Sequence, residues 1–163
     1  MEKLTVLTNG QVSIAVSADG AELCSLRKGE KEYLWQADPI YWKRHSPVLF
    51  PIVGSVWENR YRIAHKEFAL SQHGFARDME FRLLSQTEQE VWYELTENEQ
   101  TLSKYPFAFS LQIGYRLEGS SVEVLWKVTN PASRNGGCTM PFQIGAHPAF
   151  YFPDYETEPS HRG

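Results

Sequence analysis

The chain has 163 residues, a net charge of −4 and 42% hydrophobic residues. This length suits one domain with a hydrophobic core, and basic residues form no stripe that would favour nucleic acid. Its apolar runs are too short to span a bilayer, and the first residues lack the apolar core of a secretory signal. Cys24 and Cys138 lie outside any cysteine-rich motif. We therefore expect a cytoplasmic protein with reduced cysteines and no metal site.

Alternating apolar residues predict strands in the first part of the chain. Val12–Val16 and Ala21–Leu26 flank Asp19-Gly20, a dipeptide typical of hairpin turns. A third strand is expected at Lys31–Trp35. These segments predict an antiparallel β-structure from the N-terminus onwards.

An irregular segment follows at residues 39–54. It contains three prolines, and it is rich in aromatic residues such as Tyr41, Trp42 and Phe50. Because proline disrupts pairing within a central strand, we expect a rigid excursion or an edge segment. Such a segment could carry binding residues or cover one end of a β-sandwich.

The remaining elements are again mostly strands. Apolar and polar residues alternate, to different degrees, in Val91–Leu95, Phe107–Leu117 and Val122–Asn130. Gly119-Ser120 provides a turn between the last two segments. Thr101–Lys104 has room for a single helical turn before Pro106. Many short strands separated by turns predict an all-β sandwich or barrel.

Two histidine segments are the strongest functional features. They are Gln72–Asp78, which contains His73 and Arg77, and Gly145–Phe150, which contains His147. Histidine titrates near neutral pH and is suited to general acid or base chemistry. Taken alone, each histidine is more often a structural residue, but the aromatic neighbours of this pair favour a sugar site.

Two arginines are candidate donors to substrate oxygens. Arg77 and Arg44 could bind hydroxyl or phosphate groups, and each could equally form a salt bridge with a surface carboxylate. The other histidines, His45, His65 and His161, lie in polar or terminal contexts, so we expect them at the surface.

Five segments in order resemble the aldose 1-epimerases, or galactose mutarotase-like proteins, and most closely their bacterial LacX-type branch. They are Arg44–Gly54, Gln72–Phe81, Tyr105–Phe109, the strand ending at Asn130, and Ile144–Phe150. The resemblance implies an all-β, mostly antiparallel galactose mutarotase-like β-supersandwich. Because family members are much longer, we expect residues 1–163 to form a single β-sandwich domain that is the N-terminal half of a larger, truncated domain.

The resemblance also implies an activity. Aldose 1-epimerases interconvert the α and β anomers of a hexose or hexose phosphate by acid/base ring opening, without a cofactor or metal. The resemblance implies that His147 is the general acid and that His73 is a sugar ligand that shares the developing charge. Arg77 and Arg44 would bind hydroxyls or a phosphate.

One departure from the family concerns the general base. In the family this is a glutamate well beyond the position of His147, and none of Asp154, Glu156 or Glu158 matches it. We therefore expect the chain by itself to be inactive and a C-terminal half or a second chain to complete it. The alternative function is a non-catalytic carbohydrate-binding module. The expected partners are a small sugar and this completing segment, with neither nucleic acid nor membrane.

Overall fold

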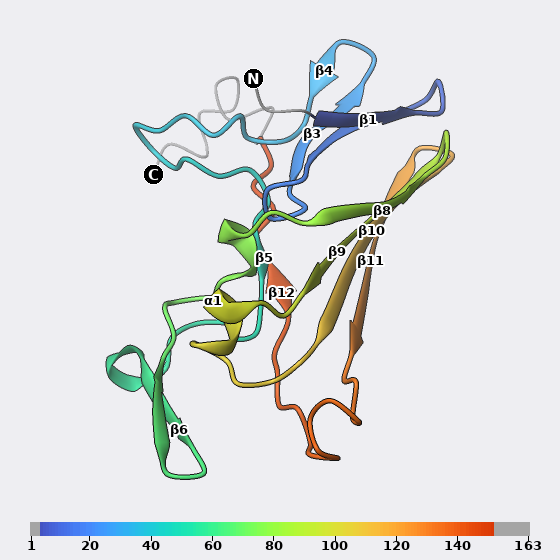
Figure 1. The fold of residues 1–163 in the computed structure, drawn as a ribbon. Helices are drawn as coiled ribbons and strands as arrows, with labels where there is room; N and C mark the ends of the chain where they lie inside the picture. The colour runs from blue at the N-terminus through green and yellow to red at the C-terminus, as the bar shows by residue number, and fades with distance from the viewer. Residues whose placement is uncertain (1–3, 152–163) are drawn as a thin grey trace.

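The computed structural model describes residues 4–151, and within them antiparallel strands dominate (Figure 1). The helical elements in this range are short: α1 at Glu99–Leu102, and single 3-10 turns at Trp57–Asn59 and Ala76–Asp78. Asn98 caps α1 by accepting a hydrogen bond from the Thr101 backbone, so the helical turn begins two residues before the predicted Thr101–Lys104. No helix in residues 4–151 is long and apolar enough to cross a membrane.

The first sheet has four antiparallel strands in the order β1-β2-β3-β4. Their bounds are Leu4–Thr8, Ser13–Ser17, Leu23–Lys28 and Lys31–Glu32. The predicted hairpin around Asp19-Gly20 is confirmed by the pairing of β2 with β3. Gly20 has a φ of +70° and donates its backbone N–H to the carbonyl of Met79 at 2.8 Å, so this turn packs against the Arg77 segment.

The second sheet has the order β11-β10-β9-β8 and is also antiparallel. Its strands are β8 at Arg82–Gln86, β9 at Glu90–Thr96, β10 at Ser110–Glu118 and β11 at Ser121–Thr129. The strands predicted at Val91–Leu95 and Val122–Asn130 are therefore confirmed. The predicted Phe107–Leu117 strand begins later, because the backbone N–H groups of Ala108 and Phe109 bond side chains instead of a neighbouring strand.

The core lies between the two sheets and joins them. The Tyr115 hydroxyl on β10 donates to the carbonyl of Ala21 at 2.7 Å, and the Tyr93 hydroxyl on β9 donates to Thr5 of β1 at 2.7 Å. Both tyrosines are 2% exposed. Buried aromatic rings that keep a hydrogen bond for their hydroxyl fix the two sheets relative to each other.

Two small sheets connect the remaining segments. β5 at Val48–Leu49 pairs with β12 at Gly145–Ala146, and a hairpin is formed by β6 at Arg60–Ile63 with β7 at Lys66–Ala69. Residues 39–54 thus supply a short paired edge, as the irregular segment predicted. The β5–β12 pairing brings together parts of the chain that are distant in sequence (Figure 1).

One predicted strand is much shorter than expected. In the Lys31–Trp35 segment only Lys31 and Glu32 form β4. The Glu32 side chain accepts hydrogen bonds from the backbone N–H groups of Leu26, Tyr33 and Leu34, and this replaces regular strand pairing. Leu34 then bridges to Phe150 near the second histidine segment.

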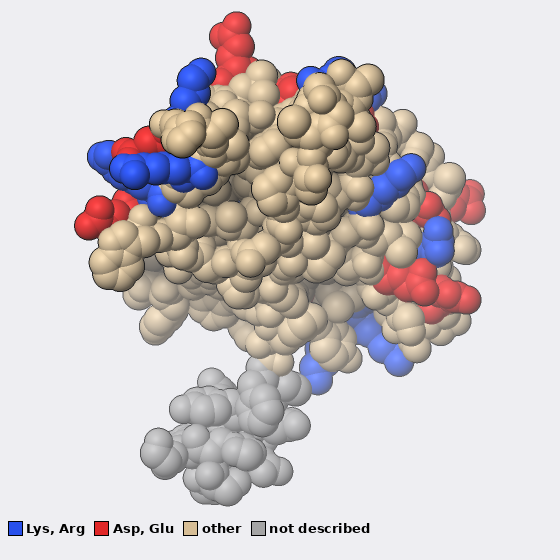
Figure 2. All heavy atoms as spheres, turned by 90° about the horizontal axis from the view of Figure 1, so that it is seen from below, with Lys and Arg blue, Asp and Glu red and all other residues tan. Residues whose placement is uncertain are grey.

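Charged side chains of both signs are mixed on the surface. On the face in Figure 2, basic and acidic groups lie next to one another around a broad uncharged area. Several arginines are paired, including Arg60 with Glu67 and Arg116 with Glu90. This face therefore presents alternating charge rather than a continuous basic surface.

Candidate active site

His73 occupies an unusual backbone conformation that fixes its ring. Its φ is +65°, a region in which histidine is tolerated better than most residues. Its backbone N–H donates to the Gly54 carbonyl at 2.7 Å, and its Nδ1 accepts the Gly54 N–H at 2.9 Å. The backbone of Gly54 therefore holds both the main chain and the imidazole of His73.

Gly74 explains why glycine follows this histidine. Its φ is +73°, and a Cβ added here would lie 2.2 Å from the carbonyl oxygen of Phe50. The same oxygen accepts the backbone N–H groups of Phe75 and Ala76. Only glycine allows this close approach, which ties the His73 segment to the end of β5.

His147 comes from the segment that extends β12. Its backbone N–H donates to the Pro47 carbonyl at 3.1 Å, and Ala149 donates to the His45 carbonyl at 3.0 Å. The pairing of β5 with β12 thus continues on either side of His147. The residue itself is exposed.

The structure brings these two histidines into contact. The ring centroids of His73 and His147 are 4.9 Å apart, and their planes are inclined by 81°. This edge-on arrangement is a preferred geometry for neighbouring rings. The two segments meet because both are bonded to residues 47–54. The His147 segment bonds Pro47 and β5, and the His73 segment bonds Gly54.

The environment of His73 favours its neutral form. Burial lowers its pKa below the ordinary value, and the positive charges of Arg77 and His147 lower it further. Because Nδ1 accepts the Gly54 N–H, the proton of the neutral ring is on Nε2. His73 is therefore suited to donate a hydrogen bond through Nε2–H, with its tautomer set by the backbone.

Arg44 and Arg77 lie side by side and share Asp78. Arg44 contacts the Asp78 carboxylate at 2.6 Å, and Arg77 reaches its other oxygen at 3.8 Å. Arg44 also donates to the backbone carbonyl of Arg77 at 3.3 Å. Both salt-bridge alternatives from the sequence are thus present, and the two guanidinium groups lie close to each other, with Arg77 near His73.

The Arg77 guanidinium is only partly satisfied by the protein. It donates from Nη2 to the Gln72 carbonyl at 2.9 Å, while its buried Nε has no hydrogen-bond partner among the described residues. Burial, and next the charge of Arg44, lower its pKa from the usual arginine value, but such a group stays protonated at neutral pH. An oxygen-rich ligand would find cationic donors here.

The four predicted site residues are therefore close together, while other expectations changed. His45 was expected at the surface, but it is half-buried against Glu22 and Cys24, because residues 45 and 46 fold back on the start of β3. His65 is exposed as expected, and His161 lies outside the described residues. Sequence reasoning gave Gly54 no role in the site, although this glycine ends both the proline-rich segment and the Arg44–Gly54 segment that resembles the family.

Three comparisons relate this chain to known proteins. Residues 3–162 match the family model described as aldose 1-epimerase. The plasmid and chromosomal LacX proteins of Lactococcus lactis subsp. lactis are each 38% identical over 158 residues. This match covers 93% of the present chain and 52% of each relative.

Solved structures agree on the fold. A galactose mutarotase related enzyme from Lactobacillus acidophilus superimposes with a TM-score of 0.90 at 35% identity, over 96% of this chain and 51% of that one. A galactose mutarotase-like protein from Lactobacillus casei ATCC 334 gives 0.85 at 36% identity, over 91% and 50%. The described strands therefore adopt the galactose mutarotase-like fold, and the chain spans about half the length of the curated relatives it matches.

Proposed function

The chain belongs to the aldose 1-epimerase family, and from this premise we propose that it carries the acid half of a site that interconverts the α and β anomers of a hexose or hexose phosphate. The observation that supports this most is the contact of His73 with His147, with Arg77 near His73 and Arg44 bonded to the Arg77 carbonyl. Mutarotation needs proton donors and hydrogen-bond donors around one sugar ring, and these four side chains offer both.

His147 is the proposed general acid. The proton moves from its imidazolium to the ring oxygen of the sugar while a base removes the proton of the anomeric hydroxyl. The bond between the anomeric carbon and the ring oxygen breaks, and an aldehyde forms. After rotation of the aldehyde, the reverse transfers close the ring on its other face. An exposed imidazole is suited to this role because a sugar can reach it from solvent.

His73 and the arginines are the proposed sugar ligands. The Nε2–H of neutral His73 donates to an oxygen on which negative charge develops, and a donor already oriented by Gly54 needs no rearrangement during the reaction. Arg77 and Arg44 bind hydroxyl groups or a phosphate through guanidinium donors. Since Asp78 neutralises only one of the two positive charges, the pair favours a substrate with a negative group.

The general base is proposed to come from a segment equivalent to the second half of the longer relatives. Asp78 is occupied as the anchor of both arginines. One part of the inner face of the second sheet is not covered by the rest of the described chain. Val124 and Trp126 on β11 are 47% and 41% exposed. Their partners on β10, Tyr115 and Ile113, are buried. A further chain segment that covers β11 would complete both the sandwich, of which residues 1–163 form the N-terminal half, and the site.

Polarimetry on freshly dissolved α-glucose and α-galactose tests this proposal. The chain alone should not accelerate mutarotation, and a chimaera with the C-terminal half of the Lactobacillus acidophilus relative should. The matched control is the chimaera with His147→Asn, checked for the same circular dichroism spectrum. Acceleration by the 163-residue chain alone would refute the proposal that the general base comes from another segment. A folded chimaera that binds sugar by NMR without accelerating the reaction would point to a carbohydrate-binding module.

A further inference from the structure

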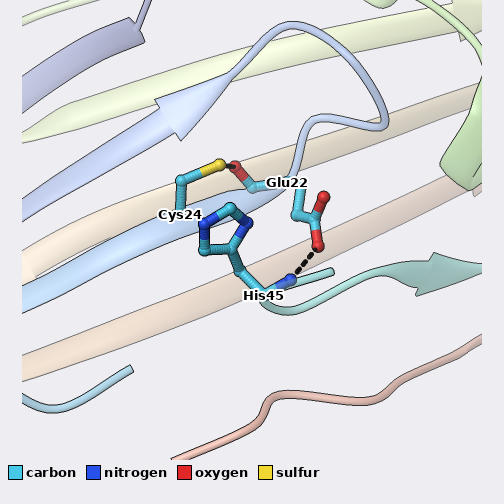
Figure 3. Close-up of side chains that lie close together, drawn as sticks. All are labelled: Glu22, Cys24 and His45. Carbon is cyan, nitrogen blue, oxygen red and sulfur yellow. Dashed lines mark hydrogen bonds between the residues drawn. The ribbon is translucent and has the colours of Figure 1, made fainter. Parts of the chain in front are cut away.

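A second cluster of reactive side chains lies on the other side of the Arg44 segment. It consists of Cys24 on β3, Glu22 just before that strand, and His45 from the segment before β5 (Figure 3). One potential ligand atom of each residue lies within 4.8 Å of the other two. Cys24 is 8% exposed, and Glu22 and His45 are half-buried. Three different metal-ligating groups are thus held close together and largely away from solvent.

The backbone already fixes two of these residues. The Glu22 Oε1 accepts hydrogen bonds from the backbone N–H groups of His45 and Ser46, both at 2.8 Å. Both bonds fall on one oxygen, and among the described residues no hydrogen bond reaches Oε2. The His45 carbonyl is held as well, by the N–H of Ala149 at 3.0 Å. The Glu22 carboxylate and the backbone of His45 are therefore held in place without a metal, which reduces the ordering needed on binding.

The donor set is characteristic of one class of cation. Thiolate, imidazole and carboxylate are together the ligands of Zn²⁺, with bonds of about 2.0–2.3 Å that place tetrahedral ligands about 3.4 Å apart. Hard cations such as Mg²⁺ prefer oxygen ligands alone. Closing the cluster from 4.8 Å requires a movement of roughly 1 Å, in which the Cys24 sulfur would exchange its hydrogen bond to the Glu22 carbonyl, at 3.3 Å, for the cation.

We propose that Glu22, Cys24 and His45 form a binding site for a thiophilic divalent cation such as Zn²⁺, with the fourth position open to water. The cation would link β3 to the segment that carries Arg44. This site is separate from the proposed acid/base chemistry, in which no metal takes part. Its occupancy would stabilise the position of the segment that leads into β5.

The full 163-residue chain, stripped with a chelator, is titrated with Zn²⁺ by calorimetry and with Co²⁺ by absorption spectroscopy. We expect one ion per chain and a thiolate-to-cobalt charge-transfer band in the near ultraviolet. Cys24→Ser should abolish that band, and His45→Gln should weaken Zn²⁺ binding at least about tenfold. The matched controls Cys138→Ser and His65→Asn, both at exposed positions, should leave binding unchanged.

Two further measurements keep the test decisive. Zn²⁺ should raise the Tm of the wild-type chain but not that of His45→Gln, a variant at a half-buried position that can be checked by circular dichroism. His161→Asn tests the histidine outside the described residues. The proposal is overturned if no charge-transfer band appears, or if binding follows Cys138, His65 or His161 instead of Cys24 and His45.

Discussion

The two histidine segments are held in different ways. His73 donates its backbone N–H to the Gly54 carbonyl and accepts the Gly54 N–H at its ring, and Gly74 allows the chain to pack closely against Phe50. His147 is held through its backbone at the end of a two-residue strand, and its side chain is exposed. One imidazole thus has a set tautomer, while the other is open to solvent. This contrast suits a binding residue next to an acid.

The largest expected effect concerns His147. In the active chimaera His147→Asn should lower kcat by about 10²- to 10⁴-fold, because it removes the transferable proton. KM should change less, since a lost transition-state interaction appears mainly in kcat. His73→Asn should raise KM and also lower kcat, but kcat less than His147→Asn does, because His73 both binds the sugar and donates a hydrogen bond to the developing negative charge. Steady-state polarimetry separates the two, and equal effects of both variants on kcat would abolish the distinction.

The fixed position of the His73 segment depends on Gly74. Gly74→Ala should destabilise the chain by about 2–5 kcal/mol, because a Cβ would collide with the Phe50 carbonyl in addition to the strain of positive φ. Gly10→Ala is the matched control, with a φ of +82° and no atom within 4 Å of the added Cβ. It should cost about 1–2 kcal/mol, the strain alone. Urea denaturation measures both, and equal losses would show that the close approach is unimportant.

The lowered pKa of His73 predicts a pH dependence of stability. The folded state resists protonation of this ring, so the unfolded state binds the proton first as the pH falls below about 6.5. The contribution of His73 to the free energy of unfolding is therefore fully present above that pH. As the pH falls towards the lowered pKa of the folded state, this contribution is lost progressively. His73→Asn should flatten this part of the curve of unfolding free energy against pH. NMR should show the Gly54 amide shifting as His73 titrates, and an unchanged curve in the variant would contradict the assignment.

The smallest expected effect concerns the charge pair beside the histidines. Asp78→Asn should change stability by less than about 1 kcal/mol, because Asp78 is 55% exposed and such pairs contribute little. It should nevertheless tighten the binding of a hexose phosphate relative to the free hexose, since two arginines would then be unneutralised. Glu67→Gln, at the distant Arg60 pair, is the control and should leave this ratio unchanged. Titration calorimetry of both sugars checks the ratio.

Several strands were missed by the sequence analysis for identifiable reasons. β8 is exposed along its whole length and therefore has no buried face to produce a clear apolar pattern. β5 and β12 have two residues each, which is too short for any periodicity. β1 and the β6–β7 hairpin also escaped prediction, since most of their positions are exposed and only Leu7 among them is buried.

The sequence by itself determined the all-β class, the hairpin at Asp19-Gly20 and the identity of the two histidine segments. These depend on turn chemistry and period-two burial, which act over a few neighbouring residues. Only the tertiary structure decided that His73 touches His147, because that contact follows from the pairing of β5 with β12. It also decided that His45 turns inwards to Glu22 and Cys24. Contacts between distant segments depend on the packing of the whole sandwich, and no local pattern encodes them.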